Sequence, residues 1–303
     1  MRSLKQIGEF EFIETIATLP RNKKSVIQGI GDDAAVVRFK KNKYLLFTTD
    51  MLLEDVHFLR KQRPQDIGHK AIAASISDIA AMGGVPEYAL FSMGLPPDLK
   101  ISFAKGIYQG IKKIARDFDI DIIGGDTNRS KKIIISVFIA GYVERKNLTL
   151  RTGAKIGDLI FVTGGLGGSE FGRHLKFTPR VKEARFLVKN YSINSMIDIS
   201  DGLIQDLGHI TKASKVGALI YEANIPLSTK AKSIKNACSQ GEDFELLFTL
   251  PKKHRQYLMK NWPFKNKPRL SCIGQIVHAN AGLKIRDEKG RLKRLKAAGY
   301  QHF

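Results

Sequence analysis

Aspartates in glycine-bounded turns, or directly after short apolar runs, are the residues of this sequence best suited to chemistry. They are Asp32 and Asp33 in GIGDDAAV, Asp50 in YLLFTTD, Asp78 in SISDIAAMGG, Asp126 in GGDTN, and Asp198 and Asp201 in IDISDG. Mg²⁺ prefers oxygen ligands and is commonly held by a few carboxylates together with substrate phosphates. Any one of these aspartates alone is more typical of a turn or a helix cap. Their shared context favours a polynuclear metal site.

Three further segments could contact a phosphate group. The glycine-rich loop TGGLGGS (163–169) could offer backbone N–H groups to an anion, and a structural turn explains it equally well. In IDISDGL, Ser200 is predicted to cap a helix whose N-terminus could bind phosphate. In GEDFELLF, Glu242 and Asp243 lie in a turn before an apolar strand, and ordinary turn formation is the alternative there. The sequence contains no GxxxxGK[ST], HExxH or GxSxG motif, which argues against a P-loop, a zinc enzyme and a serine hydrolase. The residues therefore favour phosphate chemistry on an aspartate-held metal.

The elements that must position these residues alternate between short strands and longer helices, which indicates an α/β (α+β) fold. The patterns predict helices at 67–82, 102–118 and 200–215, and strands at 44–49, 120–123, 133–143, 159–163 and 244–250. We expect GGDTNRS to be a turn between two of these strands. A polar stretch near residue 145 predicts a boundary between two domains.

Composition excludes several classes of protein. The 303 residues are 43% hydrophobic, so a packed core is expected rather than disorder. Fifty Lys and Arg against 29 Asp and Glu give a net charge of +21, but the cations are scattered, which favours a solvated surface over a nucleic-acid interface. Two cysteines cannot build a disulfide framework, so we expect a reducing, cytoplasmic setting. The most apolar run, 133–143, is too short to span a membrane, and no signal peptide is visible.

Nine segments, in this order, resemble the thiamine-monophosphate kinase family of the aminoimidazole ribonucleotide synthetase-like superfamily. They are GEFEFI, GIGDDAAV, TTDMLLEDVHF, GHKAIAASISDIAAMGG, GGDTN, LTLRTGAKIGDLIFVTG, SMIDISDGLIQDLGHI, GEDFELLFT and GYQHF. The resemblance implies a two-domain aminoimidazole ribonucleotide synthetase-like fold. Residues 1–145 would bind metal and ATP and pair their sheet in a homodimer, and residues 146–303 would form an α/β domain that closes over nucleotide and substrate.

The resemblance also implies roles for individual residues. Mg²⁺ ligands would be Asp33, Thr48, Thr49, Asp50, Asp78, Asp126, Asp198 and Asp201. ATP contacts would be Gly125, Asp126, Arg151 and Ser200, with Tyr108 as a weaker match. Substrate contacts would be His57 and Glu242, and Phe303, Tyr300 or Trp262 could replace an aromatic residue that the family carries where this sequence has Ala297. Gly168 stands where an aspartate is common, and the segment after Ser169 is shorter than usual.

The implied activity is that of a phosphotransferase with a phosphate group as acceptor: ATP phosphorylates thiamine monophosphate to thiamine diphosphate with several Mg²⁺ ions. Because the acceptor phosphate is largely a dianion at neutral pH, with a second pKa of about 6, the reaction needs no catalytic base. Two alternatives stay open at this point. One is another ATP-dependent enzyme of the superfamily with a different phosphorylated or acyl substrate, and the other is a basic nucleic-acid-binding protein.

Overall fold

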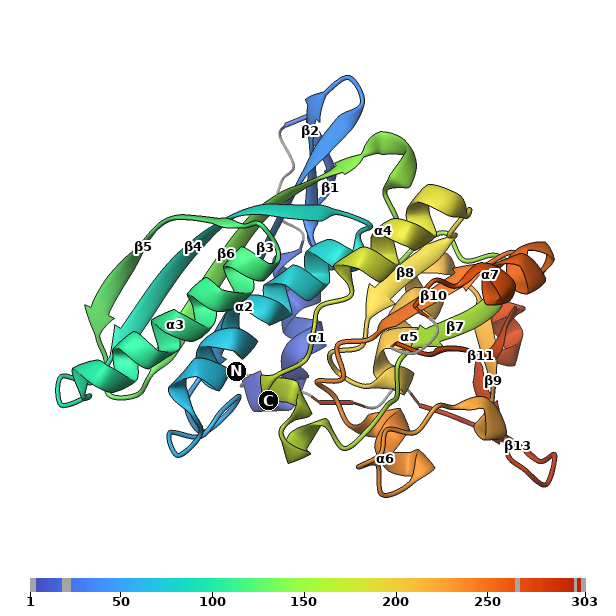
Figure 1. Cartoon of the computed structure of the whole chain (residues 1–303). Helices are drawn as coiled ribbons and strands as arrows, with labels where there is room; N and C mark the ends of the chain where they lie inside the picture. The colour runs from blue at the N-terminus through green and yellow to red at the C-terminus, as the bar shows by residue number, and fades with distance from the viewer. Residues whose placement is uncertain (1–3, 18–22, 265–267, 297–298, 301–303) are drawn as a thin grey trace.

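The computed structural model describes residues 4–17, 23–264, 268–296 and 299–300, and its strands form two sheets side by side (Figure 1). The first sheet has six strands in the order β1-β2-β3-β6-β4-β5. Their bounds are β1 Val26–Gln28, β2 Ala35–Lys40, β3 Lys43–Leu53, β6 Ile134–Glu144, β4 Val85–Leu95 and β5 Asp121–Arg129. Neighbouring strands are antiparallel, except that β4 runs parallel to β5, which lies at one edge of the sheet.

Helices α2 (Pro64–Ala81) and α3 (Ile101–Asp117) cover one face of this sheet (Figure 1). Proline at the first position of α2 suits a helix start, because the missing N–H would have no helical partner there. The two helices pack closely: a Cβ atom built on Gly68 would lie 1.9 Å from the carbonyl oxygen of Ile107. Because α2 lies between the sheet, α3 and the second half of the chain, most of its residues are buried. Both predicted helices are confirmed to within one turn.

The second sheet has seven strands in the order β13-β12-β9-β11-β7-β10-β8. Their bounds are β13 Leu292–Arg294, β12 Leu283–Arg286, β9 Gly217–Tyr221, β11 Leu270–Val277, β7 Leu159–Thr163, β10 Leu246–Leu250 and β8 Ser195–Asp198. The other helices are α1 Leu4–Ile16, α4 Val181–Asn190, α5 Leu203–Ser214, α6 Ile234–Ser239 and α7 Arg255–Asn261. No described helix has the length and apolar character needed to cross a membrane.

Side-chain alternation along the strands divides the second sheet between two cores. Ile160 and Val162 of β7 pack with Leu207 of α5 on one face. Phe161, between them in sequence, points to the opposite face, where the core also contains Leu187 of α4 and Ile76 of α2. The larger core is therefore continuous from the first sheet to the second, and it brings α2 against the end of β8.

Two local predictions are wrong. The segment GGDTNR is not a turn, because Gly124–Arg129 belong to β5. Pairing with β4 overrides the turn preference of these residues, and Gly125 fits there because a Cβ would lie 2.0 Å from the carbonyl oxygen of Phe91. Helix α5 begins at Leu203 rather than Ser200, so Ser200 does not cap it. Gly202, with a φ of 119°, precedes the helix instead.

Candidate active site

Three aspartates from three separate elements meet where the two sheets adjoin. Asp33 precedes β2, Asp78 lies on α2, and Asp198 ends β8. One carboxylate oxygen of each lies within 4.8 Å of the others. All three come from different motifs of the sequence, separated by up to 165 positions (198 − 33). We call this group the aspartate cluster.

Hydroxyl groups hold the carboxylates in place. Thr48 Oγ1 donates to Asp78 Oδ2 at 2.6 Å, and Ser75 Oγ donates to Asp50 Oδ2 at 2.6 Å. Thr48 and Asp50 are two positions apart on β3, and Ser75 and Asp78 three apart on α2, so each pair shares one face of its element. Strand β3 and helix α2 therefore present matching rows of polar groups to each other. Asp50 lies close enough to the aspartate cluster for its charge to act on Asp78.

The hydroxyl groups of Ser77 and Thr49 have different acceptors. Ser77 Oγ donates to Asp198 Oδ2 at 2.6 Å, which ties α2 to β8 across the two sheets. Thr49 Oγ1 donates to the carbonyl oxygen of Val137 at 3.0 Å, so its side chain is engaged on β6. Sequence reasoning missed Ser75 and Ser77. The signal available was the sequence SISD, because Ser75 lies about one helical turn before Asp78 and so shares its face. Ser77 directly precedes Asp78 and points to another side of the helix, so no local pattern indicated its contact with Asp198.

Burial and mutual repulsion disfavour negative charge in the aspartate cluster. Burial, followed by the charge of Asp33, raises the pKa of Asp198 to about 8. Burial, followed by the charges of Asp50 and Asp198, raises the pKa of Asp78 well above its ordinary value. Asp33 Oδ2 is buried with no hydrogen-bond partner among the described residues. Close carboxylates with an orphaned oxygen fit a hard divalent cation, which would satisfy that oxygen and offset the repulsion.

Arg151 connects the aspartate cluster to the turn before β2. Its Nη2 and Nε donate to Asp33 Oδ1 at 2.6 and 3.2 Å, and its backbone N donates to Asp32 Oδ2 at 3.1 Å. Burial raises the pKa of Asp32 to about 7, with the charge of Asp33 as the next cause. The sequence placed Asp32 among the aspartates suited to a metal site, although the family resemblance implied no role for it. In the structure Asp32 is the acceptor that fixes the Arg151 backbone.

Ser200 and Asp201 follow β8 into the turn before α5. The carbonyl oxygen of Ser200 accepts from the backbone N of Glu242 at 2.7 Å, so the IDISDG and GEDF motifs adjoin. Asp201 does not share the aspartate cluster. Its carboxylate lies within 4.8 Å of ligand atoms of Asp206 and His209, and Asp206 Oδ2 accepts from the backbone N of Asp201 at 3.2 Å.

Gly125, Asp126 and Tyr108 lie apart from the aspartate cluster within one chain. They line a pocket of about 410 Å³ at the edge strand β5. Strands β6 and β4 separate β5 from β3, which carries Asp50, so the two regions are about 14 Å apart at the usual strand spacing. Asp126 accepts a hydrogen bond from Asn128 Nδ2 at 2.6 Å.

Lys70 connects two of the candidate substrate residues, His57 and Glu242. His57 Nδ1 accepts from the backbone N of Leu53 at 3.0 Å, and Lys70 Nζ donates to the carbonyl oxygen of His57 at 2.7 Å. Lys70 also forms an ion pair with Glu242. The third candidate, Phe303, and the position Ala297 lie outside the described residues.

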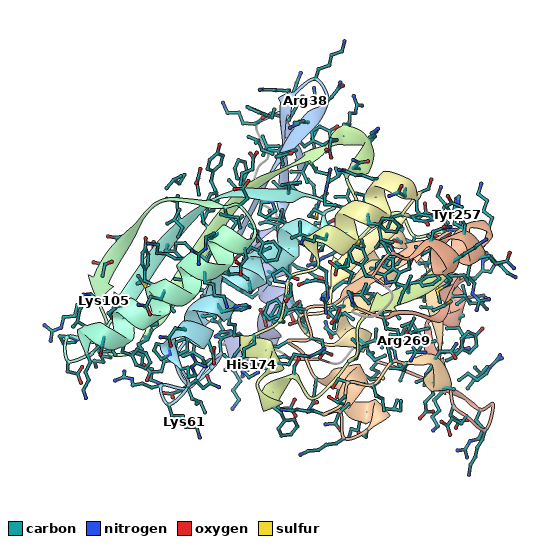
Figure 2. All side chains as sticks on the ribbon, viewed as in Figure 1. Arg38, Lys61, Lys105, His174, Tyr257 and Arg269 are labelled. Atoms are coloured by element: carbon teal, nitrogen blue, oxygen red, sulfur yellow. The ribbon has the colours of Figure 1, made fainter. Side chains whose placement is uncertain are left out.

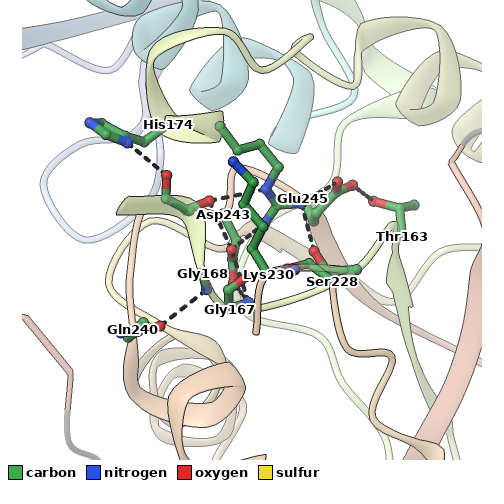
Figure 3. Close-up of polar contacts among 12 residues, drawn as sticks. Thr163, Gly167, Gly168, His174, Ser228, Lys230, Gln240, Asp243 and Glu245 are labelled. Atoms are coloured by element: carbon green, nitrogen blue, oxygen red, sulfur yellow. Dashed lines mark hydrogen bonds and ion pairs between the residues drawn. The ribbon is translucent and has the colours of Figure 1, made fainter. Parts of the chain in front are cut away.

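The glycine-rich loop binds an anion of its own chain rather than presenting free amides (Figure 3). The backbone N of Gly167 donates to Asp243 Oδ2 at 2.9 Å, and the backbone N of Gly168 donates to Gln240 Oε1 at 3.1 Å. Ser169 Oγ donates to Asp243 as well, at 3.0 Å. Of the two interpretations left open for this loop, the structure favours a structural turn, in which Asp243 fills the position where a ligand phosphate would lie.

Comparison with known proteins agrees with this architecture. Residues 31–143 match the family described as "AIR synthase related protein, N-terminal domain". A thiamine-monophosphate kinase of Buchnera aphidicola subsp. Schizaphis graminum is 38% identical, with 98% of this chain and 99% of that protein covered. That of Bacillus subtilis is 33% identical, with 98% and 100% covered. This chain belongs to the thiamine-monophosphate kinase family.

Solved structures of the thiamine-monophosphate kinase family share the fold over the whole chain. The structure titled "AaThiL complexed with AMPPCP and TMP" superposes with a TM-score of 0.86 at 35% identity, covering 100% of this chain and 99% of that one. The thiamine-monophosphate kinase of Aquifex aeolicus superposes with a TM-score of 0.78 at 32% identity, covering 97% and 100%. The hydrogenase maturation protein HypE, at 18% identity and a TM-score of 0.71, covering 93% and 92%, shares the fold. The α/β fold expected from the sequence is confirmed.

Proposed function

We propose that this chain transfers the γ-phosphoryl group of ATP to the phosphate of thiamine monophosphate, giving thiamine diphosphate. The aspartate cluster carries the proposal, because buried carboxylates that share a cation suit the meeting of two anionic phosphates. The family relatives bear the name of this activity, and one superposed structure holds the ATP analogue AMPPCP together with TMP.

The chain's own residues would hold several Mg²⁺ ions. Asp33, Asp78 and Asp198 form the centre, and Asp50, Thr48, Thr49, Asp126 and Asp201 are the further ligands we propose. When bound, Mg²⁺ neutralises phosphate charge and acts as a template for in-line transfer. Arg151 and Ser200 would contact ATP phosphates, since Arg151 already lies against Asp33 with its guanidinium half-buried.

A homodimer is part of the proposal. The face of the first sheet away from α2 and α3 exposes large apolar side chains, among them Met51 (56% exposed) and Leu90 (37%), which alternate with buried neighbours along β3 and β4. A second copy covering this face would bury them. The placement of Asp126 and Tyr108 far from Asp50 within one chain fits a site to which the partner subunit brings these residues and Gly125.

The proposal also assigns the substrate contacts and the roles of the two halves of the chain. His57 and Glu242 would contact thiamine monophosphate, with Phe303 as an additional aromatic contact. Residues 1–145 would bind metal and ATP, and residues 146–303 would close over the nucleotide. No side chain acts as a general base, because the acceptor oxygen is already ionised at neutral pH. A cytoplasmic setting stays a prediction.

The test is a direct product assay. The purified chain is incubated with ATP, Mg²⁺ and thiamine monophosphate, and thiamine diphosphate is quantified by chromatography. We expect ATP- and Mg²⁺-dependent product from the wild type and none from Asp78→Asn. ATP consumption without thiamine diphosphate, or only with another phosphorylated acceptor, would support a different member of the superfamily instead.

A further inference from the structure

Lys70 is the one lysine or arginine that is buried in the described part of the chain. It lies on α2 with 1% of its surface exposed, two turns before Asp78. Its Nζ atom donates to the carbonyl oxygen of His57 at 2.7 Å and forms an ion pair with Glu242. One ammonium group therefore connects three segments: the loop after β3, helix α2, and the GEDF turn of the second half of the chain.

Burial of this lysine has a free-energy cost that only its partners offset. An unpaired ammonium in an apolar interior is strongly disfavoured, and burial accordingly lowers the pKa of Lys70 against the opposing effect of Glu242. A leucine or methionine would fill the same space on α2 without that cost. Packing alone therefore does not explain why a lysine is present at this position.

The GEDF turn is held in an uncommon backbone conformation next to Lys70. Glu242 and Phe244 have φ values of 63° and 49°, which non-glycine residues rarely adopt. Phe244 stacks on Phe177 with ring centroids 4.0 Å apart, and both pack against Ala73 and Ala74 of α2. The ion pair and this stack together fix the turn against the helix.

Only one carboxylate oxygen of Glu242 is bound by a described residue. Its Oε1 atom receives Lys70, its side chain is 35% exposed, and Oε2 has no hydrogen bond from any described residue. A ligand that offers an N–H group or a positive charge can therefore reach Oε2. Thiamine carries both a cationic thiazolium and an amino group, so this oxygen suits such a ligand.

We propose that Lys70 is a positioning residue of the thiamine monophosphate site, which fixes the Glu242 carboxylate and the His57 loop in the orientation that receives the organic part of the substrate. This inference rests on the proposed function. It assigns recognition of thiamine to a lysine that would not itself touch the substrate. The metal and ATP sites on the same helix would work without it.

Steady-state kinetics of Lys70→Met, Glu242→Gln and the double variant test the inference. Lys105→Met is the control, since Lys105 is an exposed lysine on α3 that points away from the molecule (Figure 2). We expect Lys70→Met to lower kcat/KM for thiamine monophosphate about 100-fold, because misplacement by about 1 Å costs that much. KM for ATP should stay within about twofold of wild type, and Lys105→Met should match wild type. The double variant should be no slower than the worse single variant, because both changes break one unit.

Three outcomes would overturn the inference: an unchanged kcat/KM in Lys70→Met, equal effects on ATP and thiamine monophosphate, or losses that multiply in the double variant. Thermal melts establish that each variant is folded. If Lys70→Met does not fold, Lys70→Gln, which keeps a donor for the His57 carbonyl but no charge, is measured against the same criteria. A wild type that makes no thiamine diphosphate in this assay would refute the proposed function itself, whereas an active wild type with an equally active Lys70→Met refutes only the role of Lys70.

Discussion

Replacing Asp198 by asparagine should stabilise the metal-free protein and weaken its response to Mg²⁺. Asp198 is 2% exposed, and burial together with the charge of Asp33 raises its pKa to about 8. The folded chain therefore binds a proton at neutral pH that the unfolded chain, with a pKa near 3.8, has released. Asparagine keeps the shape of the side chain and can still accept from Ser77, but it needs no proton.

The sign and size follow from linkage between protonation and folding. Below pH 3.8 both states are protonated and Asp198 has no effect, and above that pH its contribution lowers stability until the folded pKa of about 8 is reached. At pH 7 the unfolded carboxyl is 3.2 pH units above its pKa (7 − 3.8), which at about 1.36 kcal/mol per unit is about 4 kcal/mol. Asp198→Asn should remove a cost of this order.

Urea unfolding in EDTA at pH 5 and pH 7 measures this effect. The free energy of unfolding of Asp198→Asn should exceed that of wild type by an amount that grows by about 3 kcal/mol between the two pH values. Asp121→Asn, which changes an exposed aspartate at the start of β5, should follow wild type at both. With Mg²⁺ added, wild type should become more stable than Asp198→Asn, because the cation stabilises only the intact cluster. Parallel pH dependences for wild type and Asp198→Asn would refute the reasoning.

Three further predictions concern the dimer, the glycine-rich loop and the pH dependence of turnover. Asp78→Asn and Asp126→Asn should each be inactive alone, and an equal mixture refolded together should recover about one quarter of wild-type activity, because half the dimers then hold one intact site. Gly164→Ala should lower the free energy of unfolding by about 1–3 kcal/mol, since its φ is 64° and its Cβ would lie 2.1 Å from Glu245 Oε1. His57→Gln should lower kcat/KM without changing the shape of kcat against pH between 6 and 9, because no side chain deprotonates the acceptor.

Each of these has a contrary result and a control. No recovered activity in the refolded mixture, with dimers present by light scattering, would place both aspartates in the same subunit's site. Gly157→Ala is the control for Gly164→Ala, because Gly157 also has a positive φ, 90°, but its Cβ would meet no atom within 4 Å. If Gly157→Ala lowers the free energy of unfolding as much as Gly164→Ala, the clash with Glu245 is not the cause of the loss. A bell-shaped profile in wild type that is lost in His57→Gln would make His57 a catalytic base.

Local patterns predicted the parts of the site that lie on one element. The apolar run 44–49 predicted a strand leading into Asp50, and the helical periodicity of 67–82 predicted the helix that carries Asp78. Their convergence with Asp198 was not readable, because it depends on how α2 packs against β8 through a core that spans both sheets. The resemblance to a family supplied that grouping, and the geometry supplies its physical reason.

Other features depend on long-range contacts that leave no local pattern. A lysine within a predicted helix is expected to be exposed to solvent. The burial of Lys70 depends on Glu242, which is distant in sequence and pairs with it only in the folded chain. The sequence of the glycine-rich loop is compatible with phosphate binding. In the structure its Gly167 amide instead donates to Asp243, which is 76 positions away, and no local pattern indicates that contact. The strand at Gly124–Arg129 exists only because β4 is its neighbour.

The most direct test of the account is the position of a bound cation relative to the aspartate cluster. Crystals of the full chain grown with Mn²⁺ and a non-hydrolysable ATP analogue would reveal the ion by its anomalous scattering. We expect peaks within bonding distance of the carboxylate oxygens of Asp33, Asp78 and Asp198, about 2.0–2.3 Å. Bound nucleotide with Mn²⁺ elsewhere, and no peak among these three carboxylates, would contradict it.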